Sequence, residues 1–260
     1  MELLLYILAG AGVGFLVGLT GVGGGSLMTP LLILFGFPPH VAIGTDLLYA
    51  SITKSSGVIS HARQKTIDWK VVATLGAGSL PASILTAVLL ALYFPDASAY
   101  QHVLTIALGF MLILTSVVLV FRDRIVAARL KASASSRSFS QRHRPAITLI
   151  SGVVLGILVT LSSVGAGAIG TAILLFLYPA LAASRVVGTD LAHAVPLTLI
   201  AGIGHVTLGN VDYALLAALL IGSLPAIQAG TWLSRRLPSA MLRPALASML
   251  MIIGVKYAFF

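Results

Sequence analysis

The sequence lacks cysteine altogether and contains few charged residues, and both shortages restrict what the protein can be. Without cysteine the chain has no thiol nucleophile, no disulfide and no cysteine-ligated metal. Charged residues make up 9% of its 260 residues and hydrophobic residues 58%, whereas a soluble domain carries about 25% charged residues. So little polar surface cannot cover a water-soluble globule, and the solvent around most of the chain must be lipid.

Apolar stretches recur along nearly the whole chain, each of roughly 20 residues and therefore long enough to cross a bilayer core of ~30 Å. The first segment, MELLLYILAG, has no basic region and no small-residue cleavage site, so we expect it to remain in the structure. The sequence predicts an all-α polytopic membrane protein. Its net charge of +9 would favour nucleic acid in a soluble protein, but here we expect no nucleic-acid partner.

The chain repeats itself at a nearly constant offset. The tetrapeptide GTDL at 44–47 recurs at 188–191, and GSLPA at 78–82 recurs at 222–226, both at a shift of 144 residues. Around the first apolar block the shift is 142, which aligns residues 14–29 with residues 156–171. The sequence therefore predicts two homologous repeats, 1–121 and 145–260. The segment 122–144 between them is basic and serine-rich, which predicts an exposed cytoplasmic linker loop.

The basic loops indicate how the repeats cross the membrane. Each repeat has a first apolar block (3–37 and 146–178) and three further spans: 40–60, 70–93 and 101–121, then 186–204, 213–233 and 241–259. Lys and Arg lie in loops 61–70 and 234–243 and in the linker, whereas loops 94–100 and 205–212 have none, so the first set is predicted cytoplasmic. Matching loops thus fall on opposite sides, which predicts inverted repeats with both termini extracytoplasmic.

An inverted arrangement requires each first apolar block to start and end on the same side, as a glycine-broken hairpin. The fold predicted is ten membrane helices or half-helices, five in each repeat. After the first glycine run, residues 26–36 span only ~16 Å as a helix, too short to cross the bilayer. The tip of the hairpin is expected near mid-membrane depth inside the protein, because unpaired backbone cannot face lipid.

The two breaks, GVGGGS at 21–26 and SVGAGA at 163–168, are the strongest candidates for a binding site. Each precedes a short helix, whose first turn has free N–H groups and a positive dipole end that attract anions. Inverted repeats bring two such helix starts together near the midplane. Alternatively, the glycines serve only close helix packing, and the hydroxyls bond to their own helix carbonyls. The candidate substrate-binding residues here are Gly21, Gly23, Gly24, Gly25, Ser26, Thr29, Ser162, Ser163, Gly165, Gly167 and Thr171.

Four of the ionisable residues inside the predicted spans are candidates for a role in function. Lys54 is a candidate to supply positive charge to an anionic substrate, or else its long side chain reaches the cytoplasmic interface. Asp46 and Asp190 are repeat-equivalent, and the surrounding GTD favours helix capping, with proton carriage as the alternative. His193 has no repeat counterpart, and its imidazole is a candidate to change charge near neutral pH. The two aspartates and His193 are candidates for coupling or gating. No G-x-S-x-G motif supports a serine hydrolase, and we expect neither an enzyme nor a cofactor or metal.

At these residues the sequence resembles the TauE/SafE (TSUP) family of anion transporters. The resemblance is carried by GFLVGLTGVGGGSLMTPLLILFGFPPHVAIGTDLL, SHARQKTIDW, the second copy SSVGAGAIGTAILLFLYPALAASRVVGTDLAHAV, and GNVDY. Members often have GTS where this chain has Gly44-Thr45-Asp46 and its repeat copy, and the second copy has Ser163 and Ala166 within its break.

This resemblance implies a transporter in the bacterial plasma (inner) membrane, an exporter of sulfur-containing oxyanions such as sulfite, thiosulfate or organosulfonates, working by alternating access. Its partners would be a small anion and the lipid bilayer, and the oligomeric state is left open, a homodimer included. The alternatives are a proton- or cation-coupled carrier of another small carboxylate, and a membrane partner protein that transports nothing.

Overall fold

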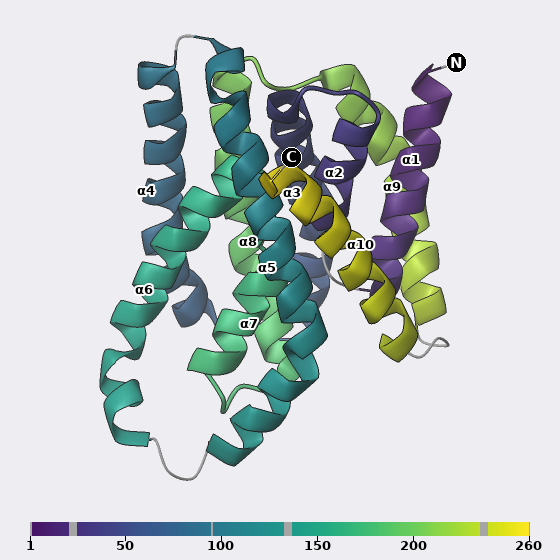
Figure 1. Cartoon of the computed structure of the whole chain (residues 1–260). Helices are drawn as coiled ribbons and strands as arrows, with labels where there is room; N and C mark the ends of the chain where they lie inside the picture. The colour runs from purple at the N-terminus through teal and green to yellow at the C-terminus, as the bar shows by residue number, and fades with distance from the viewer. Residues whose placement is uncertain (1, 21–24, 95, 133–136, 235–238, 260) are drawn as a thin grey trace.

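The computed structural model describes residues 2–20, 25–94, 96–132, 137–234 and 239–259, and within them the chain is helical with short connections (Figure 1). The helices of the first repeat are α1 (Glu2–Thr20), α2 (Gly25–Leu34), α3 (Pro39–Arg63), α4 (Trp69–Tyr93) and α5 (Ala97–Ala132). Those of the second repeat are α6 (Arg137–Ser162), α7 (Ala168–Leu177), α8 (Ala183–Thr207), α9 (Tyr213–Ser234) and α10 (Ser239–Phe259). The all-α prediction is confirmed.

Within the described parts of the chain, five helices are long and apolar enough to cross a membrane: α4, α5 (within Ala99–Phe121), α6 (within His143–Ser162), α8 and α9. The helix after each break is short, as predicted. Both α2 and α7 have 10 residues, about 15 Å at 1.5 Å per residue, which is half a bilayer core. Residues 21–24, with Gly21, Gly23 and Gly24, lie outside the described residues.

The prediction of a loop over the linker was wrong for most of its length. Helix α5 continues to Ala132 and α6 begins at Arg137, so only residues 133–136 lie outside the described structure. Both helices extend beyond the rest of the bundle at the end opposite the N-terminus (Figure 1). The reason is that Ala, Arg, Lys and Leu, which dominate 125–132, are strong helix formers. Charge excludes these residues from a membrane span but not from a helix.

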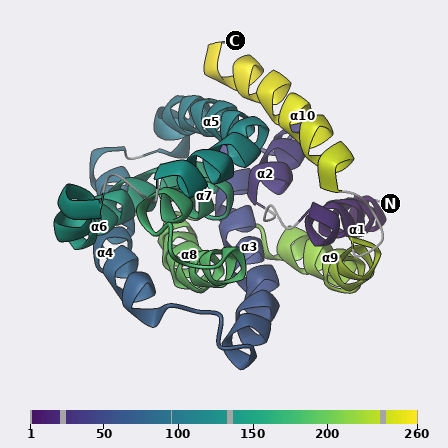
Figure 2. The same cartoon turned by 90° about the horizontal axis from the view of Figure 1, so that it is seen from below.

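Helices α3 and α8 occupy the middle of the bundle, as the view along it shows (Figure 2). At one edge α1 packs along α9, and at the other edge α6 packs along α4. Both edge pairs rely on glycine at equivalent positions. A Cβ on Gly14 would lie 2.7 Å from Ser223 Cα, and one on Gly156 would lie 2.9 Å from Ser79 Cα. Small residues thus let the backbones approach closely, as membrane helices require.

The two repeats also exchange equivalent hydrogen bonds. Thr189 Oγ1 on α8 accepts a bond from the Asp68 backbone N–H at 2.9 Å. Thr45 Oγ1 on α3 accepts one from the Asp212 backbone N–H at 3.1 Å. The shift of 144 residues seen in the sequence relates the two threonines to each other and the two aspartates to each other. This reciprocity is expected of two halves related by an internal two-fold axis, while their inverted orientation in a membrane stays a prediction.

Candidate functional site

A carboxylate two turns into α3 contacts elements of both broken hairpins. Asp46 is fully buried, and its Oδ2 accepts hydrogen bonds from Thr29 Oγ1 of α2 and, at 3.0 Å, from Ser163 Oγ of the break between α6 and α7. Its other oxygen, Oδ1, is buried and has no hydrogen-bond partner. The half-helix α2 and the second break therefore meet at Asp46, through two hydroxyls that the sequence had marked as substrate ligands.

Asp190 on α8 makes the equivalent contact in the second repeat. Its Oδ2 accepts a hydrogen bond from Thr171 Oγ1 of α7 at 2.9 Å, and its Oδ1 is buried without a partner. The absence of a side chain on Gly170 leaves space for this carboxylate, because a Cβ on Gly170 would overlap Asp190 Oδ1. Both aspartates are thus held against the half-helix that follows the break of their own repeat.

The capping interpretation of the two aspartates was wrong. Helix α3 begins at Pro39 and α8 at Ala183, and neither has a side-chain cap at its start. Asp46 and Asp190 lie about two turns further along. A carboxylate at that depth in a helix has no free backbone N–H to cap, so its hydrogen bonds go to hydroxyls on neighbouring elements.

Lys54 points into the second break. Its side chain is buried, with 6% of its surface exposed, and Nζ donates to the Ala166 carbonyl oxygen at 2.9 Å. The ammonium interacts electrostatically with both Asp46 and Asp190. Among the described residues it forms no ion pair within hydrogen-bonding range. The side chain is therefore not extended to the interface, and its charge is held between the two carboxylates.

His193 lies three residues after Asp190 and on the same side of α8. Its Nε2 is 2.7 Å from Ser79 Oγ of α4, and Nδ1 is buried without a partner. The histidine borders a separate cavity of 380 Å³ between α4 and α8. Lys54 acts on it electrostatically, so the candidate coupling residues form one group.

The rest of the second break has the backbone that glycine permits. Gly165 and Gly167 have φ of +115° and +137°, where side chains are rarely found. The Ser162 hydroxyl donates to the Leu158 carbonyl at 2.6 Å and accepts from the Val164 N–H at 3.2 Å, so it stabilises the break itself. In the first hairpin Gly25 begins α2, and the Ser26 side chain is buried beside it.

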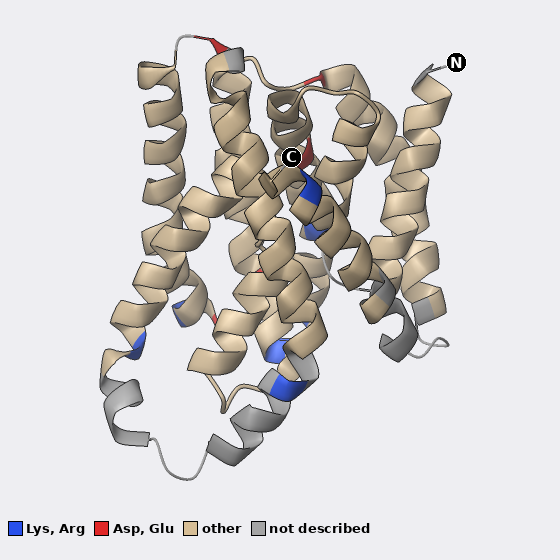
Figure 3. Ribbon diagram, viewed as in Figure 1, with Lys and Arg blue, Asp and Glu red and all other residues tan. Residues whose placement is uncertain are grey.

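A cavity of 570 Å³ leads to Lys54 from the surface, and we call it the vestibule. Its lining comes from α1, α3, α8 and α9: Val17, Gly18, Thr53, Lys54, Ser56, Gly57, Ser60, His61, Val187, Leu191, Ile227, Gln228, Thr231 and Trp232. His61 belongs to the last turn of α3, next to Arg63. Most described Lys and Arg side chains gather at that end of the molecule (Figure 3).

Sequence reasoning missed the polar lining of this vestibule. Small and polar residues occupy positions i, i+3, i+4 and i+7 on the face of α3 that includes Lys54: Thr53, Ser56, Gly57 and Ser60. That spacing would have predicted a polar, water-accessible helix face next to the buried lysine.

The equivalent region of the other repeat is closed. Thr160 and Ser83, the counterparts of Gly18 and Ile227, are fully buried, and their hydroxyl oxygens are 2.7 Å apart. His205, the counterpart of His61, is also fully buried and lies 2.9 Å from the Thr160 carbonyl. Other buried counterparts of vestibule residues are Ile43, Leu47, Ala87, Val159, Leu197, Thr198 and Ala201. We call this set, with Ser83, Thr160 and His205, the closed gate.

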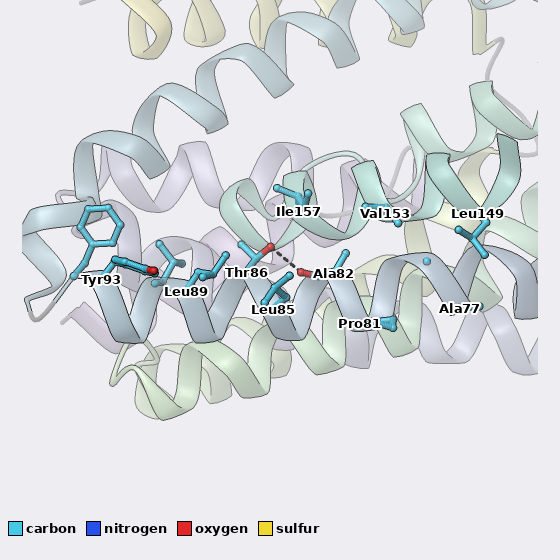
Figure 4. Close-up of a pocket in the computed structure, with 13 residues that line it drawn as sticks. Ala77, Pro81, Ala82, Leu85, Thr86, Leu89, Tyr93, Leu149, Val153 and Ile157 are labelled. Carbon is cyan, nitrogen blue, oxygen red and sulfur yellow. Dashed lines mark hydrogen bonds between the residues drawn. The ribbon is translucent and has the colours of Figure 1, made fainter. Parts of the chain in front are cut away.

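A larger cavity of 740 Å³ lies between α4 and α6, but its lining is unsuited to an ion (Figure 4). Its residues are almost all apolar, among them Leu85, Leu89 and Ile157, and the Thr86 hydroxyl is bonded to the Ala82 carbonyl at 2.7 Å. Over the described residues, no group of three or more His, Asp or Glu side chains lies together as a metal site.

Comparisons with known proteins agree with this architecture. The profile of the family described as sulfite exporter TauE/SafE matches residues 6–257. The chain is 41% identical to "Probable membrane transporter protein YjnA" of Bacillus subtilis strain 168, over 96% of this chain and 97% of that one. It is 28% identical to "Probable membrane transporter protein MJ0441" of Methanocaldococcus jannaschii, over 96% and 93% of the two chains. No solved structure matches significantly. This chain belongs to the TauE/SafE family and is a membrane transporter.

Proposed function

We propose that this transporter exports sulfur-containing oxyanions, such as sulfite, thiosulfate or organosulfonates, across the bacterial plasma membrane. The observation that carries the proposal is Lys54, a buried cation that lines the vestibule beside the polar face of α3 and contacts the second helix break. An unpaired buried charge is strongly unfavourable, so it is retained where it has a partner or a ligand.

The proposed site lies between the start of α2 and the break before α7. The α2 and α7 helix starts contribute positive dipole ends, Lys54 contributes a full charge, and Ser26, Thr29 and Ser163 contribute hydroxyls. At an effective dielectric constant of 20, two unit charges about 4 Å apart attract by about 4 kcal/mol. An anion beside Lys54 would gain this attraction, and donors on several sides suit a group with three oxygens.

Alternating access is supported by the difference between the two repeats. The vestibule reaches Lys54 from the end where basic residues gather, which the positive-inside rule assigns to the cytoplasm. The closed gate covers the equivalent path toward the opposite side. Rocking one repeat against the other would exchange the two arrangements, as in other transporters built from inverted repeats. With this orientation both termini are extracytoplasmic.

The test is transport by the purified protein in liposomes. Sulfite, thiosulfate, sulfoacetate, taurine, sulfate and acetate are applied in turn, with currents recorded on a solid-supported membrane and tracer flux measured for electroneutral exchange. Saturable flux of a sulfur oxyanion exceeding that of acetate supports the proposal. Preference for acetate favours the carboxylate carrier, and absence of flux for every anion in both assays contradicts a transporter of these anions that acts alone.

A further inference from the structure

The hydroxyls best placed to bind a substrate anion are occupied by the protein's own carboxylates. Thr29 and Ser163 donate to Asp46, and Thr171 donates to Asp190. A hydroxyl has one hydrogen to donate. While Asp46 accepts from both hydroxyls, neither is available to a second anion at the same place.

The charges around Asp46 also disfavour a second anion. With both carboxylates ionised and Lys54 protonated, this buried group carries one net negative charge. On α3 the neighbouring titratable groups are Lys54 and Tyr49, and on α8 they are Asp190 and His193. Among the described residues, α2, α7, α9 and the second break contribute neutral hydroxyls to this group, those of Thr29, Thr171, Ser223 and Ser163. An entering anion would therefore meet an uncompensated carboxylate.

Asp46 has one oxygen that the protein leaves without a bond. Its Oδ1 is fully enclosed, with no hydrogen-bond partner, although a buried unsatisfied polar atom costs about 1–3 kcal/mol. A proton on this oxygen would turn an unpaired acceptor into a donor that can bond an anion. It would also weaken the hold of Asp46 on Thr29 and Ser163.

We propose that Asp46 occupies the anion site in the substrate-free protein, and that each anion binds together with one proton, which is held by Asp46. The inference rests on the proposed function, since it assigns the coupling ion of the same site. The proton enters from water through the vestibule and neutralises the carboxylate, while the anion takes over the two hydroxyls and pairs with Lys54. Anion and proton would then cross together.

Serine supplies a neutral hydroxyl, whereas aspartate supplies a group whose charge can change. The substitution Asp46→Ser therefore removes the proton carrier.

The experiment measures anion binding and proton uptake together on the purified protein. Thiosulfate and methanesulfonate serve as probes, because both are anions of strong acids whose charge is constant around neutral pH. Calorimetric titrations in two buffers of different ionisation enthalpy count the protons taken up, and the Kd is followed as pH rises. Uptake of one proton per anion predicts a Kd that weakens toward tenfold per pH unit at alkaline pH.

The variants separate coupling from binding. Asp46→Asn and Asp46→Ser should retain anion binding but lose both proton uptake and the pH dependence, whereas the control Asp96→Asn, at an exposed aspartate just before α5, should retain both. Wild-type binding without proton uptake, binding that requires sodium in place of the proton, or an unchanged pH slope in both Asp46 variants would overturn this inference alone. Absence of binding of both probes at every pH would contradict the proposed function itself.

Discussion

A disulfide across the closed gate should hold the transporter in the conformation described above. Ala87 on α4 and Gly204 on α8 are the counterparts of Thr231 and Ser60, which line the open vestibule, and a Cβ built on Gly204 would lie 2.7 Å from Ala87 Cβ. The Cβ atoms of a disulfide lie about 3.8 Å apart, so Ala87→Cys with Gly204→Cys should close with a shift of about 1 Å. Because the sequence has no cysteine, this bond would be the only disulfide available within the chain.

The assay compares anion flux into liposomes before oxidation, after oxidation and after reduction. If the gate must open in every cycle, the residual flux should equal the fraction of protein left uncrosslinked, as counted by gel mobility, and reduction should restore it. Each single cysteine variant, treated identically, controls for oxidation and for the substitution. Unchanged flux through a fully crosslinked protein would refute the assignment of these residues to a moving gate.

Two further predictions use matched positions. In the substrate-free protein, Gly57→Cys in the vestibule should react with a membrane-impermeant maleimide. Its repeat counterpart Ala201→Cys, at a fully buried position, should not react. Equal labelling of the two variants would contradict the difference between the two sides. Gly170→Ala should destabilise the protein by about 1–3 kcal/mol, because the new methyl group would overlap Asp190. Gly12→Ala, with open space around the new methyl group, should unfold at the wild-type temperature. Equal melting temperatures of the two variants in detergent would contradict this packing of Gly170 against Asp190.

The spans and the two broken hairpins could be predicted because their signals are local. Hydrophobic length defines a membrane helix, and glycine interrupts it, so α2 and α7 begin where the sequence predicted. The prediction of a loop over the linker was wrong because apolar content was the only helix signal considered. The charged helix formers before Ala132 also favour a helix.

The contacts of the site could not be predicted, because they depend on tertiary structure. Asp46 is bonded to residues 17 and 117 positions away, Thr29 and Ser163, and no local pattern joins them. Local reasoning instead paired Asp46 with its own helix start. Lys54 is similar, because its partner Ala166 belongs to the other repeat. The sequence gives no signal for the closed gate, because repeat-equivalent residues line the open vestibule in one half of the protein and are buried in the closed gate in the other.

Removal of the Lys54 charge tests the central claim most directly. The measurement is the concentration dependence of anion flux in liposomes containing Lys54→Met, with Lys256→Met, an exposed lysine near the end of α10, as control. An attraction of about 4 kcal/mol, at about 1.4 kcal/mol per tenfold, predicts a half-saturating concentration two to three orders of magnitude higher for Lys54→Met and unchanged for Lys256→Met. Wild-type affinity in a folded Lys54→Met protein would contradict an anion site built around this lysine.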